Sequence, residues 1–185
     1  MVNGDGGMNE NKAKILELMW ANENHAEFGQ IAKVTGLKPR ALNMHLRGLV
    51  KDGYIAKEKW HEYALTSLGR EVLGFPKTDG KLAQKVLGRT PQETVFRFYR
   101  GIDQPAGVTS DSLEDFCEKL GAMDAAIVEF HVGRGDFEAW IVALGDAELA
   151  KRLKGIREAK LTGEPLRKKV HETVKSRHAE LLNAK

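Results

Sequence analysis

The segment from Thr35 to Ile55, TGLKPRALNMHLRGLVKDGYI, constrains the fold more than any other part of this sequence. Its apolar side chains recur at the i, i+4, i+7, i+8 spacing of one helix face, at Leu42, Leu46, Leu49 and Val50. Pro39 suits the first turn of a helix, where a missing N–H costs nothing, and Gly36 and Gly53 mark helix ends. The segment therefore predicts a helix that packs one face into a core.

The rest of the same helix is almost uniformly basic, although a helix that only packs tolerates any mixture of charges. Its polar side and its start carry Lys38, Arg40, Asn43, Met44, Arg47 and Lys51. In a helix that enters the major groove, Arg forks onto guanine and Asn onto adenine, and a Lys further along contacts phosphate. We therefore expect these six residues to bind nucleic acid. The alternative is a solvated basic face. His45 is next to the leucines and is expected to pack.

Short elements are predicted on either side of this helix. Ile15 and Met19 mark a preceding helix that ends near Asn22–Asn24, and FGQIAKVTG marks a second one. After the basic helix, YIAKEKWHEYALT predicts two strands joined by a tight turn near Lys59–His61. A threonine then caps a further helix, SLGREVLG.

The turn between the two strands carries a second set of candidate nucleic-acid contacts. Lys57 and Lys59 are expected to contact phosphate, because cations on such a hairpin touch the flanking backbone or the minor groove. Trp60 either stacks on a sugar or base or covers the hairpin. The sequence leaves both roles of Trp60 open.

The order of these elements resembles the winged helix-turn-helix of the MarR and ArsR types of regulator. The residues that carry the resemblance are IAKVTGLKPRALNMHLRGLVKDGYI, the helix-turn-helix, and YALTSLGREVL, the exit from the wing. The resemblance covers roughly residues 12–73, about a third of the chain. It implies a fold and a DNA-facing helix, and it does not identify an operator.

Gly, Pro and Asp cluster in GFPKTDG, from Gly74 to Gly80, and divide the 185-residue chain in two. We expect a disordered leader at 1–11, a winged helix-turn-helix domain at 12–74, a linker at 75–89 and a C-terminal α+β domain at 90–185. The predicted fold class is α+β and mainly helical. A small, mostly helical domain with one or two short strands follows the winged helix-turn-helix.

The C-terminal half has less regular patterns. VFRFYRG predicts a strand, although Thr90 and Glu93 resemble a capping box, and a Gly/Pro turn follows in GIDQPAG. Ser110 or Asp111 is expected to cap the helix SLEDFCEKLGAM, whereas AAIVEFHV is ambiguous between strand and helix. FRFYRGI, SLEDFCEKL and EFHVGRGDFEAWI resemble an uncharacterised domain that we associate with archaeal proteins, and this resemblance implies no activity.

The net charge of +3 is unevenly distributed along the chain. Residues 90–150 hold four Lys and Arg against twelve Asp and Glu, whereas residues 151–185 hold eleven against four. The basic terminal helix has an apolar stripe at Leu166, Val170, Val174 and Leu181, beside Lys168, Lys169, Lys175 and Arg177. This stripe packs either on its own domain or on a second copy. We expect a homodimer that presents two recognition helices to paired half-sites.

The segment EFHVGRGDFEAW holds the one conceivable catalytic cluster, formed by Glu129, His131, Arg134, Asp136 and Trp140. His131 with an orienting carboxylate has the residue types of acid–base catalysis. However, Asp136 is placed to cap a helix, and the segment has no nucleophile motif. The chain also has no GxxxxGK[ST] phosphate loop and no His/Cys spacing suited to zinc. We therefore expect a structural role for this segment, with a ligand pocket as the alternative, and no cofactor, metal or catalysis.

No apolar run approaches the roughly 18–20 residues that span a bilayer. The single cysteine, Cys117, is expected to be a buried thiol in a reducing cytoplasm. Together these features predict a non-enzymatic, cytoplasmic, dimeric transcription regulator whose partner is double-stranded DNA. The alternative is an interaction protein that docks on structured RNA or the ribosome through the winged helix. A third, weaker interpretation makes the C-terminal half an enzyme tethered to a DNA-binding module.

Overall fold

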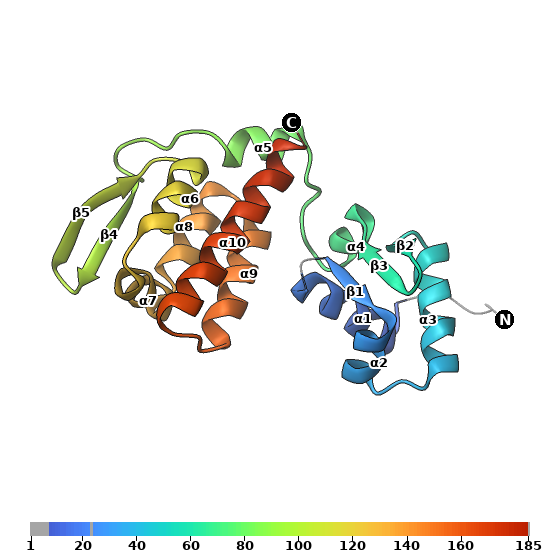
Figure 1. Cartoon of the computed structure of the whole chain (residues 1–185). Coiled ribbons are helices and arrows are strands. Elements are labelled where there is room, and N and C mark those ends of the chain that lie inside the picture. Colours follow the sequence, from blue (N-terminus) through green and yellow to red (C-terminus); the bar gives the residue numbers. More distant parts are fainter. Residues whose placement is uncertain (1–7, 23, 185) are drawn as a thin grey trace. The chain divides into compact units, whose positions relative to one another are not determined.

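A computed structural model describes residues 8–22 and 24–184, and the chain forms two compact units, residues 1–77 and 78–185 (Figure 1). The boundary falls inside GFPKTDG. The described residues are mainly helical with two small sheets, which confirms the α+β, mainly helical fold class. None of their helices is long and apolar enough to cross a membrane. Residues 1–7 of the expected leader lie outside the described residues, and the first helix already begins at Glu10.

The described residues of the N-terminal unit form four helices and a three-stranded sheet. The helices are α1 (Glu10–Ala21), α2 (Phe28–Thr35), α3 (Pro39–Lys51) and α4 (Ser67–Val72). The strands are β1 (His25–Glu27), β2 (Ile55–Lys59) and β3 (Glu62–Leu65), in the order β1-β3-β2. Leucines of α3 pack with α1 and with Ile31 of α2 in one core. This core fixes which side of α3 faces away from the unit.

Local signals in the sequence explain where these elements end. Gly36 has a φ of 68°, the left-handed conformation that ends α2, and Asn9 accepts a hydrogen bond from the Lys12 N–H at the start of α1. The Thr66 hydroxyl accepts from the Gly69 N–H, 3.1 Å away, and donates to the Gly53 carbonyl, 2.7 Å away. A Cβ at Gly69 would lie 2.2 Å from the Tyr54 carbonyl oxygen. Only glycine therefore allows α4 to approach the end of α3 so closely.

Strand β1 was not predicted from the sequence. It pairs antiparallel with β3, with His25 opposite Ala64 and Glu27 opposite Glu62. Three residues are too few to show the apolar–polar alternation by which a strand is recognised. The strand is therefore defined by its pairing with β3, which lies more than thirty residues further along the chain.

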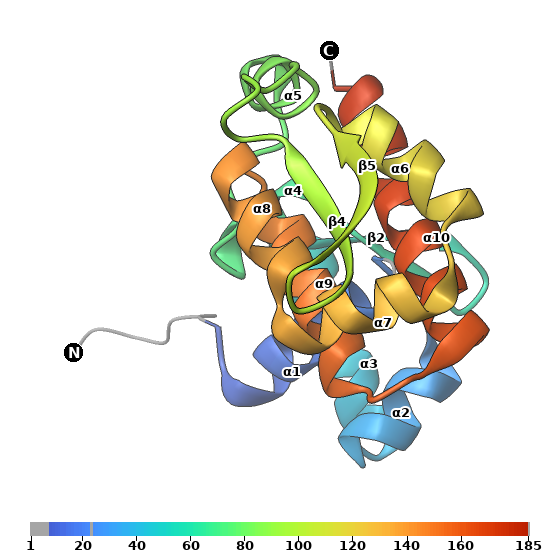
Figure 2. The same ribbon diagram turned by 90° about the vertical axis from the view of Figure 1, so that its left-hand side faces the viewer.

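In the described part of the C-terminal unit, six helices pack with one β-hairpin, seen toward the viewer in Figure 2. The helices are α5 (Gly80–Val86), α6 (Leu113–Ala122), α7 (Ala125–Arg134), α8 (Asp136–Leu144), α9 (Ala147–Glu158) and α10 (Gly163–Leu182). Strands β4 (Phe96–Gly101) and β5 (Gln104–Ser110) form the antiparallel hairpin. Phe96 and Phe98 point from β4 into the aromatic core with Phe116, Phe137 and Trp140.

Several local predictions for this half need correction. The expected linker contains α5, whose Ala83 and Val86 are buried in the core of the C-terminal unit. The favoured strand is confirmed as β4, and Thr90 starts no helix, since its hydroxyl donates to the Asp111 carbonyl. Ser112, rather than Ser110 or Asp111, caps α6 by accepting from the Asp115 N–H. The ambiguous segment AAIVEFHV is helical, and β5 was not predicted.

The stripe of the terminal helix faces the unit's own core, which corrects its expected role. The four residues predicted to join two copies are almost fully buried within one chain: Leu166, Val170, Val174 and Leu181. They pack in the same cluster as residues of α6, α7 and α9. These side chains therefore offer no surface to a second copy, and the intramolecular solution that the sequence left open is the one that the fold adopts.

Arg177 of α10 is buried with its charge partners. Its guanidinium donates to Asp146 at 2.7 and 3.2 Å and to Glu180 at 2.8 Å, and it lies 3.1 Å from Glu148. Burial, the largest single influence, lowers the pKa of Arg177, but its hydrogen bonds and charge interactions with Asp146, Glu148 and Glu180 together outweigh burial and raise the pKa, so the group stays charged. The charge asymmetry between residues 90–150 and 151–185 is thus partly neutralised inside one chain, as these contacts and the Arg157–Glu138 ion pair show.

Candidate nucleic-acid interface

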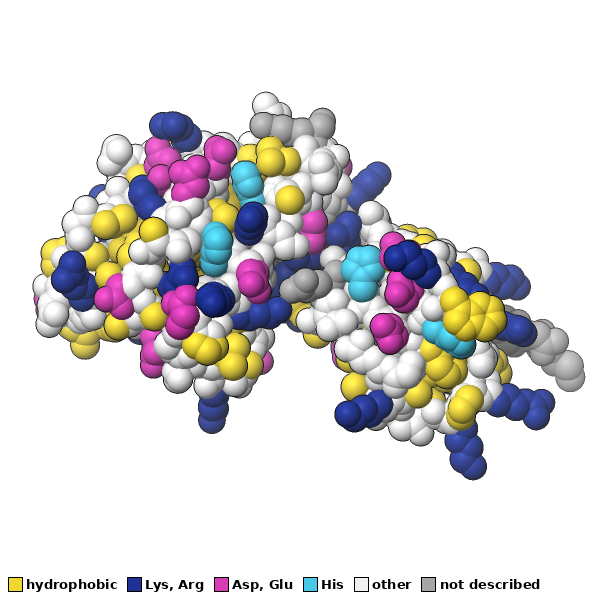
Figure 3. Space-filling view, in the orientation of Figure 1, with side chains coloured by type: hydrophobic (Ala, Val, Ile, Leu, Met, Phe, Trp, Pro, Cys, Tyr) yellow, Lys and Arg dark blue, Asp and Glu magenta, His cyan; other side chains and the backbone are white. Residues whose placement is uncertain are grey.

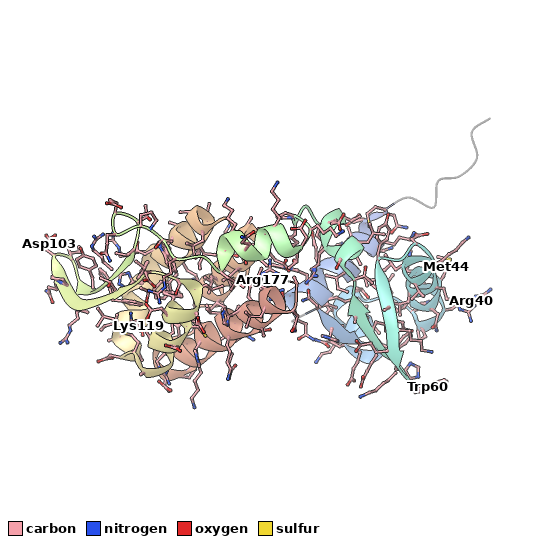
Figure 4. The ribbon with its side chains drawn as sticks, turned by 90° about the horizontal axis from the view of Figure 1, so that it is seen from above. Arg40, Met44, Trp60, Asp103, Lys119 and Arg177 are labelled. Carbon is pink, nitrogen blue, oxygen red and sulfur yellow. The ribbon has the colours of Figure 1, made fainter. Side chains whose placement is uncertain are left out.

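The outer face of α3 presents the predicted contact residues to solvent. Lys38, Arg40, Asn43, Met44, Arg47 and Lys51 are all exposed, and Met44 is 63% exposed. Leu42, Leu46 and Leu49 are fully buried on the other side. Figure 4 shows Arg40 and Met44 pointing away from the N-terminal unit. Val50 is 39% exposed while His45 is buried, so His45 replaces Val50 as the fourth core position of the helix.

The described residues of the protein do not neutralise the positive charge of this face. Asp52, the acidic residue at the end of α3, is bound 2.9 Å away by Lys12, a buried residue of α1. Among the residues that the structure describes, no ion pair involves Lys38, Arg40, Arg47, Lys51, Lys57 or Lys59. Lysine and arginine side chains project over α3 at the right-hand side of Figure 3. An anionic partner would meet these cations without breaking an existing ion pair.

The exposed side chains of α3 line a broad, open depression. It is bordered by Lys38, Arg40, Ala41, Asn43, Met44 and Arg47. Asn43 lies in it with its side-chain N–H donating 3.0 Å to the Pro39 carbonyl, which is part of the helix itself. Reading adenine needs the amide oxygen and one of the two N–H groups, so the second N–H of Asn43 remains available while the first donates to Pro39.

The hairpin of β2 and β3 carries the other three predicted residues. Lys57, Lys59 and Trp60 are exposed, and Trp60 is 81% exposed at the turn (Figure 4). The Lys57 ammonium lies 5.2 Å from the centre of the Trp60 ring, within the range of a cation–π contact. His61, with a φ of 64°, completes the turn, and its carbonyl accepts from the Phe28 N–H of α2. Trp60 therefore does not cover the hairpin but stands out from it.

The cluster in EFHVGRGDFEAW is held by structural contacts in the C-terminal unit. His131 is buried, its Nε2 accepts the Tyr99 N–H at 2.8 Å, and its Nδ1 lies 2.8 Å from Asp136. Because a backbone N–H only donates, Nδ1 carries the proton of a neutral ring, and burial lowers the pKa of His131. Asp136 does not cap a helix as predicted but holds this histidine at the start of α8.

The remaining three members of this cluster also have structural partners, and Arg134 donates to Asp136 at 3.1 Å. Glu129 accepts from the Gly163 N–H at 2.9 Å, and the Trp140 indole donates to the Thr94 carbonyl at 2.9 Å. Within residues 8–22 and 24–184, no three His, Cys, Asp or Glu side chains are grouped to hold a metal ion. Cys117 is buried, and burial raises the pKa of its thiol, so its nucleophilic thiolate is disfavoured.

Comparison with known proteins supports the same assignment for the N-terminal unit. Residues 8–56 match the model of a family described as winged helix-turn-helix DNA-binding. This range covers α1 to α3 and reaches the start of β2. The N-terminal unit is therefore a winged helix-turn-helix, with α2 and α3 as the helix-turn-helix and the β2–β3 hairpin as its wing. No curated protein and no solved structure matches the chain significantly.

Proposed function

We propose that this protein is a transcription regulator of the MarR or ArsR type that binds double-stranded DNA through α3 and the wing. The observation that carries the proposal is the set of six exposed cations on these two elements, which are not ion-paired within the described residues. A duplex presents a dense row of phosphates to such a surface and releases counterions on binding. No catalysis is proposed.

Each residue has a distinct role in this proposal. Arg40 and Arg47, on the exposed face of α3, read guanine edges in the major groove, and Met44 between them makes apolar contact with a thymine methyl. Asn43 reads adenine through its amide oxygen and the N–H that does not donate to Pro39. The four lysines Lys38, Lys51, Lys57 and Lys59 contact phosphates on either side.

The proposal includes a homodimer in the cytoplasm that reads a two-fold symmetric site. The support is general, because winged helices commonly read paired half-sites. The surface that joins the copies must differ from the stripe of α10, which is buried within one chain. Light scattering of the whole chain at tens of micromolar tests this part. A dimer would support the proposed homodimer, and a monomer that also binds a single half-site would contradict it.

One observation favours structured RNA or the ribosome as a second candidate partner. Trp60 is 81% exposed, and its ring is positioned by Lys57. Exposed aromatic rings stack on unpaired RNA bases, whereas a wing on DNA needs only cations. DNA remains the better-supported partner because the guanidinium and amide groups lie along one helix, where base edges of the major groove are read.

A binding titration separates the two candidates. Fluorescence anisotropy with labelled random-sequence duplex DNA is followed by competition with unlabelled duplex and with ribosomal RNA. We expect duplex DNA to bind and to compete at least as well as RNA per phosphate. About six phosphate contacts predict a slope near −5 for log K against log salt concentration. A flat salt dependence, or RNA that displaces DNA at far lower concentration, would contradict DNA as the partner.

A further inference from the structure

A second candidate site lies in the C-terminal unit, between the β4–β5 hairpin and helix α7. It is a cavity of about 340 Å³ whose lining includes Arg97, Tyr99, Ile102, Phe130, Arg134 and Asp136. We call it the hairpin pocket. Its size is in the range of small-molecule sites, which combine apolar walls with a few convergent polar groups. Its lining comes from β4, the hairpin turn, α7 and α8, all within one unit.

Arg134 is held in this pocket as an oriented receptor for an anion. Its Nε donates to Asp136 at 3.1 Å, and its guanidinium lies 5.3 Å from the centre of the Phe130 ring. Within the described residues its two terminal nitrogens donate no hydrogen bond. An arginine whose Nε is fixed by a carboxylate keeps its Nη groups free to bind a further carboxylate.

Two other polar side chains of the pocket, His131 and Asp136, are already engaged within the protein. Both nitrogens of His131 are engaged, with Tyr99 and Asp136, so this histidine has no free donor or acceptor. Asp136 accepts from His131 and from the Nε of Arg134, so its carboxylate is engaged within the protein. Arg97 supplies the second cation, and its Nη2 donates to the Gln92 carbonyl at 3.1 Å, which limits its movement.

The apolar residues of the lining indicate the chemical character of the rest of the ligand. Phe130 lies beneath the Arg134 guanidinium, Phe96 forms part of the wall, and Ile102 is 73% exposed at the hairpin turn. An isoleucine so exposed next to a pocket gains a contact when an apolar ligand enters. We propose that the hairpin pocket binds a small organic carboxylate with an apolar body, its carboxylate on Arg134 and its body against Phe130 and Ile102.

Asp103 provides a test of the sign of the ligand's charge. It lies at the hairpin turn, where Figure 4 labels it, and it lines the pocket. Its carboxylate repels an anionic ligand, so Asp103→Asn should bind such a ligand more tightly. A cationic ligand would respond in the opposite way.

The experiment is a titration of the full chain with benzoate and hexanoate, followed through backbone amide shifts of Tyr99 and Arg134. Benzamide serves as the neutral isostere of benzoate. We expect both carboxylates to shift these amides and benzamide to bind at least tenfold more weakly, since a neutral amide cannot form the bidentate ion pair of a carboxylate with a guanidinium. Arg134→Gln should weaken benzoate binding about tenfold or more. Arg100→Gln, an exposed arginine of β4 outside the pocket lining, should leave it unchanged.

A second variant keeps the test decisive if Arg134→Gln disturbs the fold. Ile102→Glu changes an exposed side chain at the pocket rim and should abolish carboxylate binding by repulsion, with no loss of thermal stability. The proposal is overturned if neither carboxylate shifts the pocket amides at 20 mM, or if benzamide binds as well as benzoate. It is also overturned if benzylamine binds instead and Asp103→Asn removes that binding.

Discussion

Helices α3 and α10 carry similar sequence patterns but use their charges in opposite ways. Both combine an apolar stripe with a cluster of cations. In α3, Arg40 and Arg47 are exposed and have no ion-pair partner among the described residues. In α10, Arg177 is fully buried and lies against several carboxylates. The two arginines of α3 are therefore available to an external anion, whereas Arg177 of α10 is not.

The partners of the two helices explain this difference. The acid nearest to α3, Asp52, is occupied by Lys12, so the helix keeps its exposed charge. The acids that face α10 come from α9 and the loop before it, and they form ion pairs with Arg177 and the neighbouring Arg152. The first arrangement favours an external anion, and the second stabilises the unit itself.

The largest expected effect is on Arg177. Arg177→Ala leaves Asp146 buried without its partner, and losing one partner of a buried ion pair costs about 3–5 kcal/mol of unfolding free energy. Urea denaturation followed by circular dichroism measures it. Lys175→Ala, an exposed cation two residues earlier, is the control and should change stability by less than about 0.5 kcal/mol. Equal losses in the two variants would remove the distinction between paired and unpaired cations.

Adjacent residues of α3 sharpen the comparison within one helix. Leu46→Ala should destabilise the N-terminal unit by about 2–5 kcal/mol, because it leaves a cavity in the core. Arg47→Ala should stay within about 0.5 kcal/mol of the wild type, because the side chain is exposed and has no ion pair among the described residues. Thermal denaturation of both variants checks this. A large loss of stability in Arg47→Ala would mean that the basic face contributes to the stability of the fold.

A smaller effect concerns the pH dependence of the C-terminal unit. The pKa of buried His131 lies below its value in the unfolded chain, so the unfolded state binds the proton more readily. The neutral, buried histidine contributes its full stabilisation above the pKa of the unfolded state, about 6.5. This contribution is lost as the pH falls from there toward the lower pKa of the folded state. Denaturation at pH 7.5 and 5.5 should show this loss in the wild type and a smaller one in His131→Gln. Equal losses of stability in the wild type and in His131→Gln would contradict the assignment of His131 as neutral.

The sequence predicted α3 well because its signals are local. The leucine spacing, Pro39 and the two flanking glycines all act within about twenty residues, and the helix bounds follow from them. The fourth core position of α3 is filled by His45 and not by Val50. Spacing alone does not choose between these two residues, because both neighbour the leucine stripe. The exposed face of α3 was predictable for the same reason.

The parts that could not be predicted depend on distant pairs. Arg177 contacts Asp146, 31 positions away, and Thr78, 99 positions away, so the partner of α10 is not visible in its own pattern. The hairpin pocket joins Tyr99 to His131 across 32 positions. The sequence singled out His131, Arg134 and Asp136 but had no signal for Arg97 or Tyr99, because β4 reaches α7 only through tertiary packing.

The central claim is that α3, and not α10, binds DNA, and two matched double variants test it directly. Arg40→Ala with Arg47→Ala and Lys168→Ala with Lys175→Ala each remove two exposed cations. In an anisotropy titration with duplex DNA, the α3 pair should weaken binding by about 1–3 kcal/mol for each arginine that reads a base, while the α10 pair stays near the wild type. Equal weakening by both pairs, or none by the α3 pair, would contradict the account.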